Sequence, residues 1–183
     1  MSEPILIASD GSSHQNGFGG PMGWAWARED GAWLSNGWHT GSNQRAELFA
    51  ILSVLLAHPR TYVRVQMDSQ YAMNVTEKWS VGWAKRGWTK PDGKPIANLD
   101  IIKPIRELME ARSVPIEFQW VKGHLKSNQF PLNTVADVRA GEASARAILA
   151  HNPEDSLKLY LDSKGRTELP NETNILKRIY MIA

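Results

Sequence analysis

Short apolar runs alternate with amphipathic stretches along the chain, and their order predicts the secondary structure. Apolar or alternating runs predict strands at residues 4–9, 24–27, 32–38, 62–67 and 115–121. Helical periodicity predicts helices at residues 43–57, just after Asp68, 99–111 and 134–150. This order is typical of an α/β protein, so we predict a five-stranded mixed sheet flanked by helices, with the first and fourth strands as neighbours.

Breaker residues predict where these elements end. The Gly-rich residues 14–23 should form a loop, and Asp30-Gly31 should form a hairpin turn. Residues 80–98 are basic and aromatic, which predicts a helix followed by a loop. Pro104 lies inside residues 99–111, so that helix starts either at Leu99 or only at the proline.

The pattern changes after residue 150. Residues 157–161 alternate apolar and polar side chains like a strand, and residues 172–182 fit either a short helix or a strand. We therefore divide the chain into a catalytic domain of residues 1–150 and a short C-terminal extension of residues 151–183. The extension could pack on the sheet edge, pair with a second chain or bind a replication partner.

The composition limits the classes of protein that fit. A chain of 183 residues with 42% hydrophobic residues suits one domain with a core. No stretch approaches the roughly 18 to 20 apolar residues of a membrane span. The absence of cysteine excludes disulfides, thiolate zinc sites and cysteine nucleophiles. We expect a cytoplasmic protein without a signal peptide, because no basic-then-apolar segment precedes the first predicted strand.

Four carboxylates stand in short signatures at the ends or starts of predicted core segments. They are Asp10 in Asp-Gly-Ser, Glu47 in Asn-Gln-Arg-Ala-Glu, Asp68 in Asp-Ser-Gln-Tyr and Asp137 in Val-Ala-Asp. Buried carboxylates are costly unless they are paired or bind a metal, and several together repel each other. Oxygen ligands favour Mg²⁺ or Mn²⁺ over zinc, and two such ions about 4 Å apart can cleave phosphodiesters. For any one acid alone, a helix cap or a surface charge explains it equally well.

The order and spacing of these signatures, followed by Val-Lys-Gly-His, resemble type 1 ribonuclease H over residues 4–148. The resemblance implies a ribonuclease H-like fold and an endonuclease that hydrolyses the RNA strand of RNA–DNA hybrids. The products would carry 5′-phosphate and 3′-hydroxyl ends, and the role would be removal of RNA primers or hybrids during DNA replication. It also implies two Mg²⁺ ions held by the four carboxylates, with Mn²⁺ as a substitute.

The same resemblance assigns His124 to proton transfer or product release, for which an imidazole near neutrality is suited. A surface loop histidine is the alternative explanation. The chain departs from the family here, because Lys126 stands where a glycine is usual and Phe130-Pro131 lengthen the spacing to Asp137.

The resemblance further implies contacts to each strand of a hybrid. Amide side chains, which both donate and accept hydrogen bonds, would contact the RNA strand: Asn16, Asn43, Gln44 and Gln70. The DNA strand would pass over aromatic and basic side chains: Tyr71, Trp79, Lys85, Arg86 and Lys90. Ser42 and Asn98 would hold one DNA phosphate, in a pocket that we expect to be weaker because Thr40 replaces an arginine of eukaryotic-like members. Capping by the amides and core filling by the tryptophans are the alternatives, and we expect core filling for Trp83 and Trp88.

Three functions remain open at this point. The chain could be a hybrid-cleaving enzyme, a non-catalytic reader of hybrid or duplex, or another nuclease of the same fold class. All four acids are present, which favours an enzyme. The net charge is only +2, so nucleic-acid binding would depend on local patches such as the basic segment after Trp79.

Overall fold

A computed structural model describes residues 3–14, 19–123, 129–166 and 169–182. Within them, one mixed sheet has the strand order β3-β2-β1-β4-β5. The strands are β1 (Ile5–Ser13), β2 (Gly20–Arg28), β3 (Trp33–Gly41), β4 (Val63–Met67) and β5 (Ile116–Trp120). The pairs β1–β2 and β2–β3 are antiparallel, and the pairs β1–β4 and β4–β5 are parallel. The predicted five-stranded mixed sheet is confirmed, as is the pairing of the first and fourth strands.

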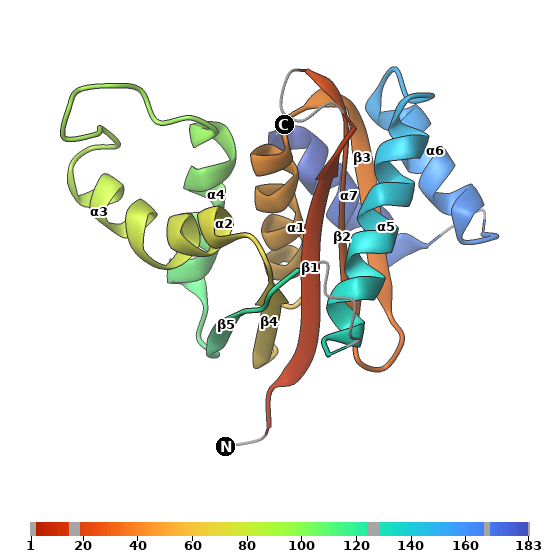
Figure 1. The fold of residues 1–183 in the computed structure, drawn as a ribbon, viewed down its shortest axis with the longest axis horizontal. Coiled ribbons are helices and arrows are strands. Elements are labelled where there is room, and N and C mark those ends of the chain that lie inside the picture. The colour runs from red at the N-terminus through yellow and green to blue at the C-terminus, as the bar shows by residue number, and fades with distance from the viewer. Residues whose placement is uncertain (1–2, 15–18, 124–128, 167–168, 183) are drawn as a thin grey trace.

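Helices cover both faces of this sheet (Figure 1). They are α1 (Asn43–Ala57), α2 (Gln70–Asn74), the π-helical η1 (Val75–Trp79), α3 (Ser80–Lys85), α4 (Leu99–Ala111), α5 (Pro131–Ala147), α6 (Pro153–Ser163) and α7 (Pro170–Ile182). α1 lies between the sheet and α4 on one face, and α5 packs on the opposite face (Figure 1). α4 begins at Leu99 with Pro104 inside it. Pro104 has no N–H, so the carbonyl of Asp100, four residues earlier, lacks its helical hydrogen bond. Asp100 is exposed, so water can bond that carbonyl instead.

α1 is the central helix of the core. The Ser42 hydroxyl caps it by accepting a hydrogen bond from the Arg45 backbone nitrogen at 3.2 Å, and Pro59 follows its C-cap residue His58. The sequence predicted one apolar face, but every residue from Ala46 to Leu56 is buried. The helix is enclosed because α4 and α7 pack on the side that faces away from the sheet.

The predicted loop at residues 14–23 is wrong at its C-terminal end, because β2 already begins at Gly20. The β1–β2 ladder continues through the pair Ser13↔Met22, so Asp10 lies inside β1 rather than after its end. Gly23 has a different role, since a Cβ on it would lie 2.2 Å from the Ser144 backbone nitrogen of α5. Glycine in β2 therefore permits close packing of a helix on the sheet.

The C-terminal extension is helical, and the predicted strand at residues 157–161 is wrong. Asn152 caps α6 by accepting a hydrogen bond from the Asp155 backbone nitrogen at 2.8 Å, and Pro153 occupies its first turn. In α7 the buried residues Leu176 and Ile179 stand three apart, which is helical spacing.

Both extension helices contribute to the main core. Tyr160, Leu176 and Ile179 are fully buried in the same hydrophobic cluster as α1. α6 also covers the edge strand β3: the Ser156 hydroxyl donates to the Gly37 carbonyl at 2.6 Å, and Lys164 Nζ donates to the Trp33 carbonyl at 2.8 Å. These side chains occupy backbone acceptors that an open sheet edge would expose. In the described part of the chain, no helix combines the length and apolar character that a membrane span requires.

Candidate active site

Three of the predicted acids converge from three separate elements. Asp10 lies in β1, Glu47 lies in the first half of α1, and Asp68 directly follows β4. Three carboxylate oxygens, one from each acid, lie within 4.8 Å of one another. Asp137 of α5 is a further neighbour, since its charge and a side-chain hydrogen bond both act on Asp10. The structure thus brings together the four acids that the sequence singled out.

The parallel register of β1 and β4 explains why Asp10 and Asp68 meet. Ala8 pairs with Gln66, and each aspartate stands two residues further along its own chain segment. Two residues along a strand return to the same face of the sheet, so the two carboxylates point to the same side. Gly11 has no side chain, which allows the start of α1 to lie close to β1. The helix residues nearest to Gly11 are Ala46 and Glu47.

Burial and mutual repulsion dominate the electrostatics of this cluster. Asp10 and Glu47 are each only 5% exposed. Burial raises the pKa of Asp10 well above its ordinary value, and the charges of Asp68 and Asp137 raise it further. Burial likewise raises the pKa of Glu47, with Asp10 and Asp68 adding to the effect. The Gly11 backbone N–H donates to Asp10 Oδ1 at 2.9 Å and opposes these shifts in part.

The amide side chains beside the cluster are exposed and start helices. Asn43 and Gln44 open α1, and Gln70 opens α2. The capping role that we considered for Asn43 belongs to Ser42, so the Asn43 side chain is not needed for it. Asn16 and His124 lie outside the described residues.

A cleft of about 670 Å³ runs between α1 and the aromatic, basic segment that follows α2. Gln44 lines it, and from the other side Tyr71, Trp79, Trp83, Arg86 and Lys90 do so. The rings of Tyr71 and Trp79 meet edge to face at 6.1 Å between centroids, and Trp79 remains 43% exposed. Lys85 ends α3 and is exposed. Trp83 and Trp88 pack half-buried against the core as expected, although Trp83 also lines the cleft.

An ion pair joins the helix starts that carry Ser42 and Asn98. Arg45 in the first turn of α1 donates twice to Asp100 in the first turn of α4, at 3.1 and 2.5 Å. Asn98 stands just before α4 with φ 58°, and its Nδ2 donates to the Tyr71 hydroxyl at 3.3 Å. Sequence patterns did not predict this ion pair, because 55 residues separate Arg45 from Asp100 and no local pattern links them.

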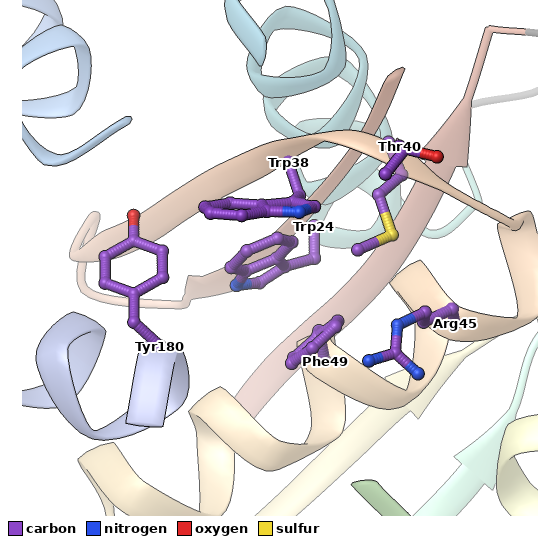
Figure 2. Close-up of a pocket in the computed structure, with 7 residues that line it drawn as sticks. Trp24, Trp38, Thr40, Arg45, Phe49 and Tyr180 are labelled. Atoms are coloured by element: carbon purple, nitrogen blue, oxygen red, sulfur yellow. The ribbon is translucent and has the colours of Figure 1, made fainter. Parts of the chain in front are cut away.

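A second, smaller cavity of about 160 Å³ has none of the four acids in its lining. Figure 2 shows the side chains that surround it. Its walls are mainly aromatic, from β2, β3, α1 and α7: Trp24, Trp38, Phe49 and Tyr180. Trp24 and Phe49 stack at 4.9 Å, and Arg45 lies over the Phe49 ring. Because Arg45 is already paired with Asp100, this cavity offers aromatic surface rather than a free charge.

Comparison with known proteins finds relatives that match over most of the chain. The RNase H family model matches residues 2–145. Ribonuclease H of Tropheryma whipplei (strain Twist) is 41% identical over 142 residues, which cover 76% of this chain and 84% of that protein. Ribonuclease HI of Streptomyces coelicolor is 38% identical over 150 residues, which cover 79% of this chain and 63% of that one.

A solved structure agrees with these relatives. The crystal structure of LC9-RNase H1, a type 1 RNase H with the type 2 active-site motif, matches with a TM-score of 0.63 at 26% identity. The match covers 79% of this chain and 74% of that one. The resemblance drawn from the short signatures is confirmed by sequence relatives and by the fold, and the chain belongs to the RNase H family of ribonucleases.

Proposed function

We propose that this chain is an endonuclease that hydrolyses the RNA strand of RNA–DNA hybrids with the help of two divalent cations. The observation that carries the proposal is the convergence of Asp10, Glu47 and Asp68, whose ligand atoms lie within 4.8 Å of one another. Gln44, one helical turn before Glu47, lines the cleft that runs to the basic segment. Acids and cleft are therefore contiguous along α1.

The residues present fit Mg²⁺ or Mn²⁺. The donors are carboxylate oxygens, which these hard cations prefer. Burial raises the pKa of both Asp10 and Glu47, and the charges of the neighbouring acids raise it further; a bound divalent cation would stabilise the ionised carboxylates. Asp10, Glu47, Asp68 and Asp137 would hold the metal. When bound, a pair of such ions supplies an activated water and stabilises the leaving 3′ oxygen, giving 5′-phosphate and 3′-hydroxyl ends.

The exposed amides of Asn43, Gln44 and Gln70 are the groups that would contact the RNA strand. They stand at the start of α1, which carries Glu47, and at the start of α2, which begins two residues after Asp68. An amide both donates and accepts, so it can bind a 2′-hydroxyl or a base edge in the minor groove of a hybrid. We assign Asn16 to the same strand and His124 to proton transfer or product release, on the basis of the family resemblance.

The cleft is the proposed path of the DNA strand. Trp79 offers an exposed ring for stacking, and Arg86 and Lys90 offer charges for phosphates. Ser42 accepts a hydrogen bond as a helix cap and still has its hydroxyl proton to donate to a phosphate oxygen. Asn98 uses Nδ2 toward Tyr71, and that amide nitrogen carries a second proton.

The wider setting follows from this activity. We propose removal of RNA primers or hybrids during DNA replication, in the cytoplasm, as the role of the enzyme. We also propose that residues 1–150 carry all catalytic groups and that residues 151–183 complete the core. No catalytic or substrate-binding group that we assign lies after Asp137.

A cleavage assay on labelled 20-mers tests the proposal. In Mg²⁺ the protein should cut the RNA of an RNA–DNA hybrid and leave duplex DNA and duplex RNA intact, while the Asp10→Asn variant should be inactive. Tight binding of the hybrid without cleavage would identify a binding module instead. Cleavage of DNA in either duplex would indicate another nuclease of the same fold.

A further inference from the structure

Trp120 ends β5 and makes a hydrogen bond that its packing does not explain. Its ring is 44% exposed, yet its indole nitrogen donates to the backbone carbonyl of Asp68 at 3.0 Å. A tryptophan that only fills space is normally buried. Here the indole N–H reaches one of the clustered acids through that acid's own backbone.

The residues after Trp120 make two further contacts, one to Met67 and one to Asp68. The Val121 backbone nitrogen donates to the Met67 carbonyl at 2.9 Å, which fixes the residue before the acid. Gly123 lies directly against the carboxylate, because a Cβ on it would be 1.8 Å from Asp68 Oδ2. The segment 120–123 therefore restrains Asp68 at three points. These are the carbonyl of Met67 just before it, the carbonyl of Asp68 itself and the Asp68 carboxylate.

Of the three converging acids, Asp68 is the one that lies outside a strand or helix. Asp10 and Glu47 lie inside regular elements, whereas Asp68 lies between the end of β4 and Ser69, the N-cap of α2. The charges of Asp10, Glu47 and Asp68 repel one another, and that repulsion favours movement of a carboxylate out of the cluster. Contacts from outside the cluster can resist it.

We propose that Trp120 and Gly123 are positioning residues that hold the Asp68 carboxylate in the cluster before a metal ion binds. This inference rests on the proposed function, in which Asp68 is a metal ligand. Groups that orient a ligand change metal affinity by about 10- to 100-fold when they are removed. Trp120 acts through the Asp68 backbone, and Gly123 acts by leaving space for its side chain.

The test is titration of Mn²⁺ into substrate-free protein, with free Mn²⁺ measured by electron paramagnetic resonance. Trp120→Phe keeps a ring and removes only the N–H donor. It should raise the Kd for Mn²⁺ about tenfold, while turnover at saturating Mn²⁺ and the KM for hybrid change little. Gly123→Ala should raise the Kd further, because the new methyl group must displace the carboxylate or the loop. Trp79→Phe, with a ring of nearly equal exposure at 43%, should leave the Mn²⁺ Kd unchanged.

The outcomes separate this inference from the proposed function. If the wild-type protein binds Mn²⁺ and cleaves hybrid but Trp120→Phe has the same Kd, the positioning role is wrong. A variant that melts at lower temperature with an unchanged Kd would show that the hydrogen bond is merely structural, which also overturns the inference. If the wild-type protein neither binds Mn²⁺ nor cleaves, the proposed function fails and this inference fails with it.

Discussion

Gly11 lies so close to α1 that a Cβ on it would be 2.3 Å from the backbone nitrogen of Glu47. β1 carries Asp10 and α1 carries Glu47, so this contact sets the separation of the two elements that hold these acids. The neighbour is helix backbone and not a flexible side chain, so it cannot yield without moving the helix. Glycine is required at this position because it permits the approach of two backbones.

Replacing Gly11 with alanine should therefore disturb both stability and the site. We expect the free energy of unfolding to fall by about 1–3 kcal/mol, as in other overpacked sites, and metal activation to weaken. Urea denaturation of metal-free protein measures the first effect. Gly141→Ala is the control, because a Cβ at that helical glycine meets nothing within 4 Å. That change should stabilise the protein by about 0.5–1 kcal/mol, and equal stability of Gly11→Ala and wild type would contradict the close contact.

Asp10→Asn should abolish turnover and yet stabilise the metal-free protein near neutral pH. The pKa of Asp10 is higher in the folded protein than its ordinary 3.8, because burial and the charges of Asp68 and Asp137 disfavour ionisation. A raised pKa means that stability is fully present below the unfolded value and is lost as pH rises through the folded one.

The comparison needs unfolding curves of both proteins from pH 4 to pH 8, with and without Mg²⁺. In chelator, wild type should lose stability relative to Asp10→Asn as pH rises. Saturating Mg²⁺ should reverse the order at pH 8, because the ion neutralises the acids of the wild type and binds the variant more weakly. A variant that is less stable than wild type in chelator at every pH would show that repulsion does not dominate the cluster.

His58 should make the protein less stable on acidification, because its pKa is lowered in the folded protein whereas that of Asp10 is raised. It is 4% exposed, and burial lowers its pKa from 6.5 to about 4. Its Nδ1 lies 3.2 Å from the Val54 carbonyl, which can only accept, so Nδ1 carries the proton and Nε2 faces Arg28. Below pH 6.5 the unfolded chain binds a proton that the folded one does not, so stability is lost as pH falls toward 4.

That loss should be about 3 kcal/mol, from about 1.4 kcal/mol per pKa unit. His58→Asn removes the titrating group and keeps a donor for the Val54 carbonyl, so the difference between its pH profile and that of wild type isolates the histidine. Parallel profiles between pH 6.5 and pH 4 would mean that His58 is not held neutral in the fold.

The sequence predicted the cluster and α1 because their signals are local. Ser42 and Pro59 mark the two ends of α1, and each acid stands in its own short signature. The strand extensions to Ser13 and Gly20 were missed because glycine indicates a loop, whereas here it makes room for helices packed on the sheet. The apolar positions of residues 157–161 fit the two-residue repeat of a strand as well as the 3.6-residue repeat of a helix. The helix-capping signal of Asn152-Pro153 would have predicted α6 correctly. The bond between Trp120 and Asp68 spans 52 residues and has no local pattern.

The basic segment should account for much of the salt dependence of hybrid binding. Changing Lys85, Arg86 and Lys90 to alanine together should flatten the slope of log K against log salt by about 2–3, since each lost phosphate contact removes about 0.7–0.9. Turnover of bound hybrid should change much less. Lys158, Lys177 and Arg178 are exposed on α6 and α7 and form a control triple of the same charge. Equal slopes for the two triple variants would place the DNA strand elsewhere.

The extension should matter for stability and not for chemistry. Tyr160 of α6 is fully buried among residues of the main core, and α6 covers the edge of β3. Tyr160→Ala should therefore cost about 3–5 kcal/mol of unfolding free energy, as for other large buried aromatics. The fraction that stays folded at low temperature should keep wild-type turnover of hybrid, because no proposed catalytic group lies in residues 151–183.

A chain that ends at residue 151 should lose the core contacts of α6 and α7 and should expose the edge of β3. We therefore expect copies of the shortened chain to associate with one another. Full stability of Tyr160→Ala would contradict the shared core, and a folded variant with normal metal binding but no turnover would show that the extension takes part in catalysis.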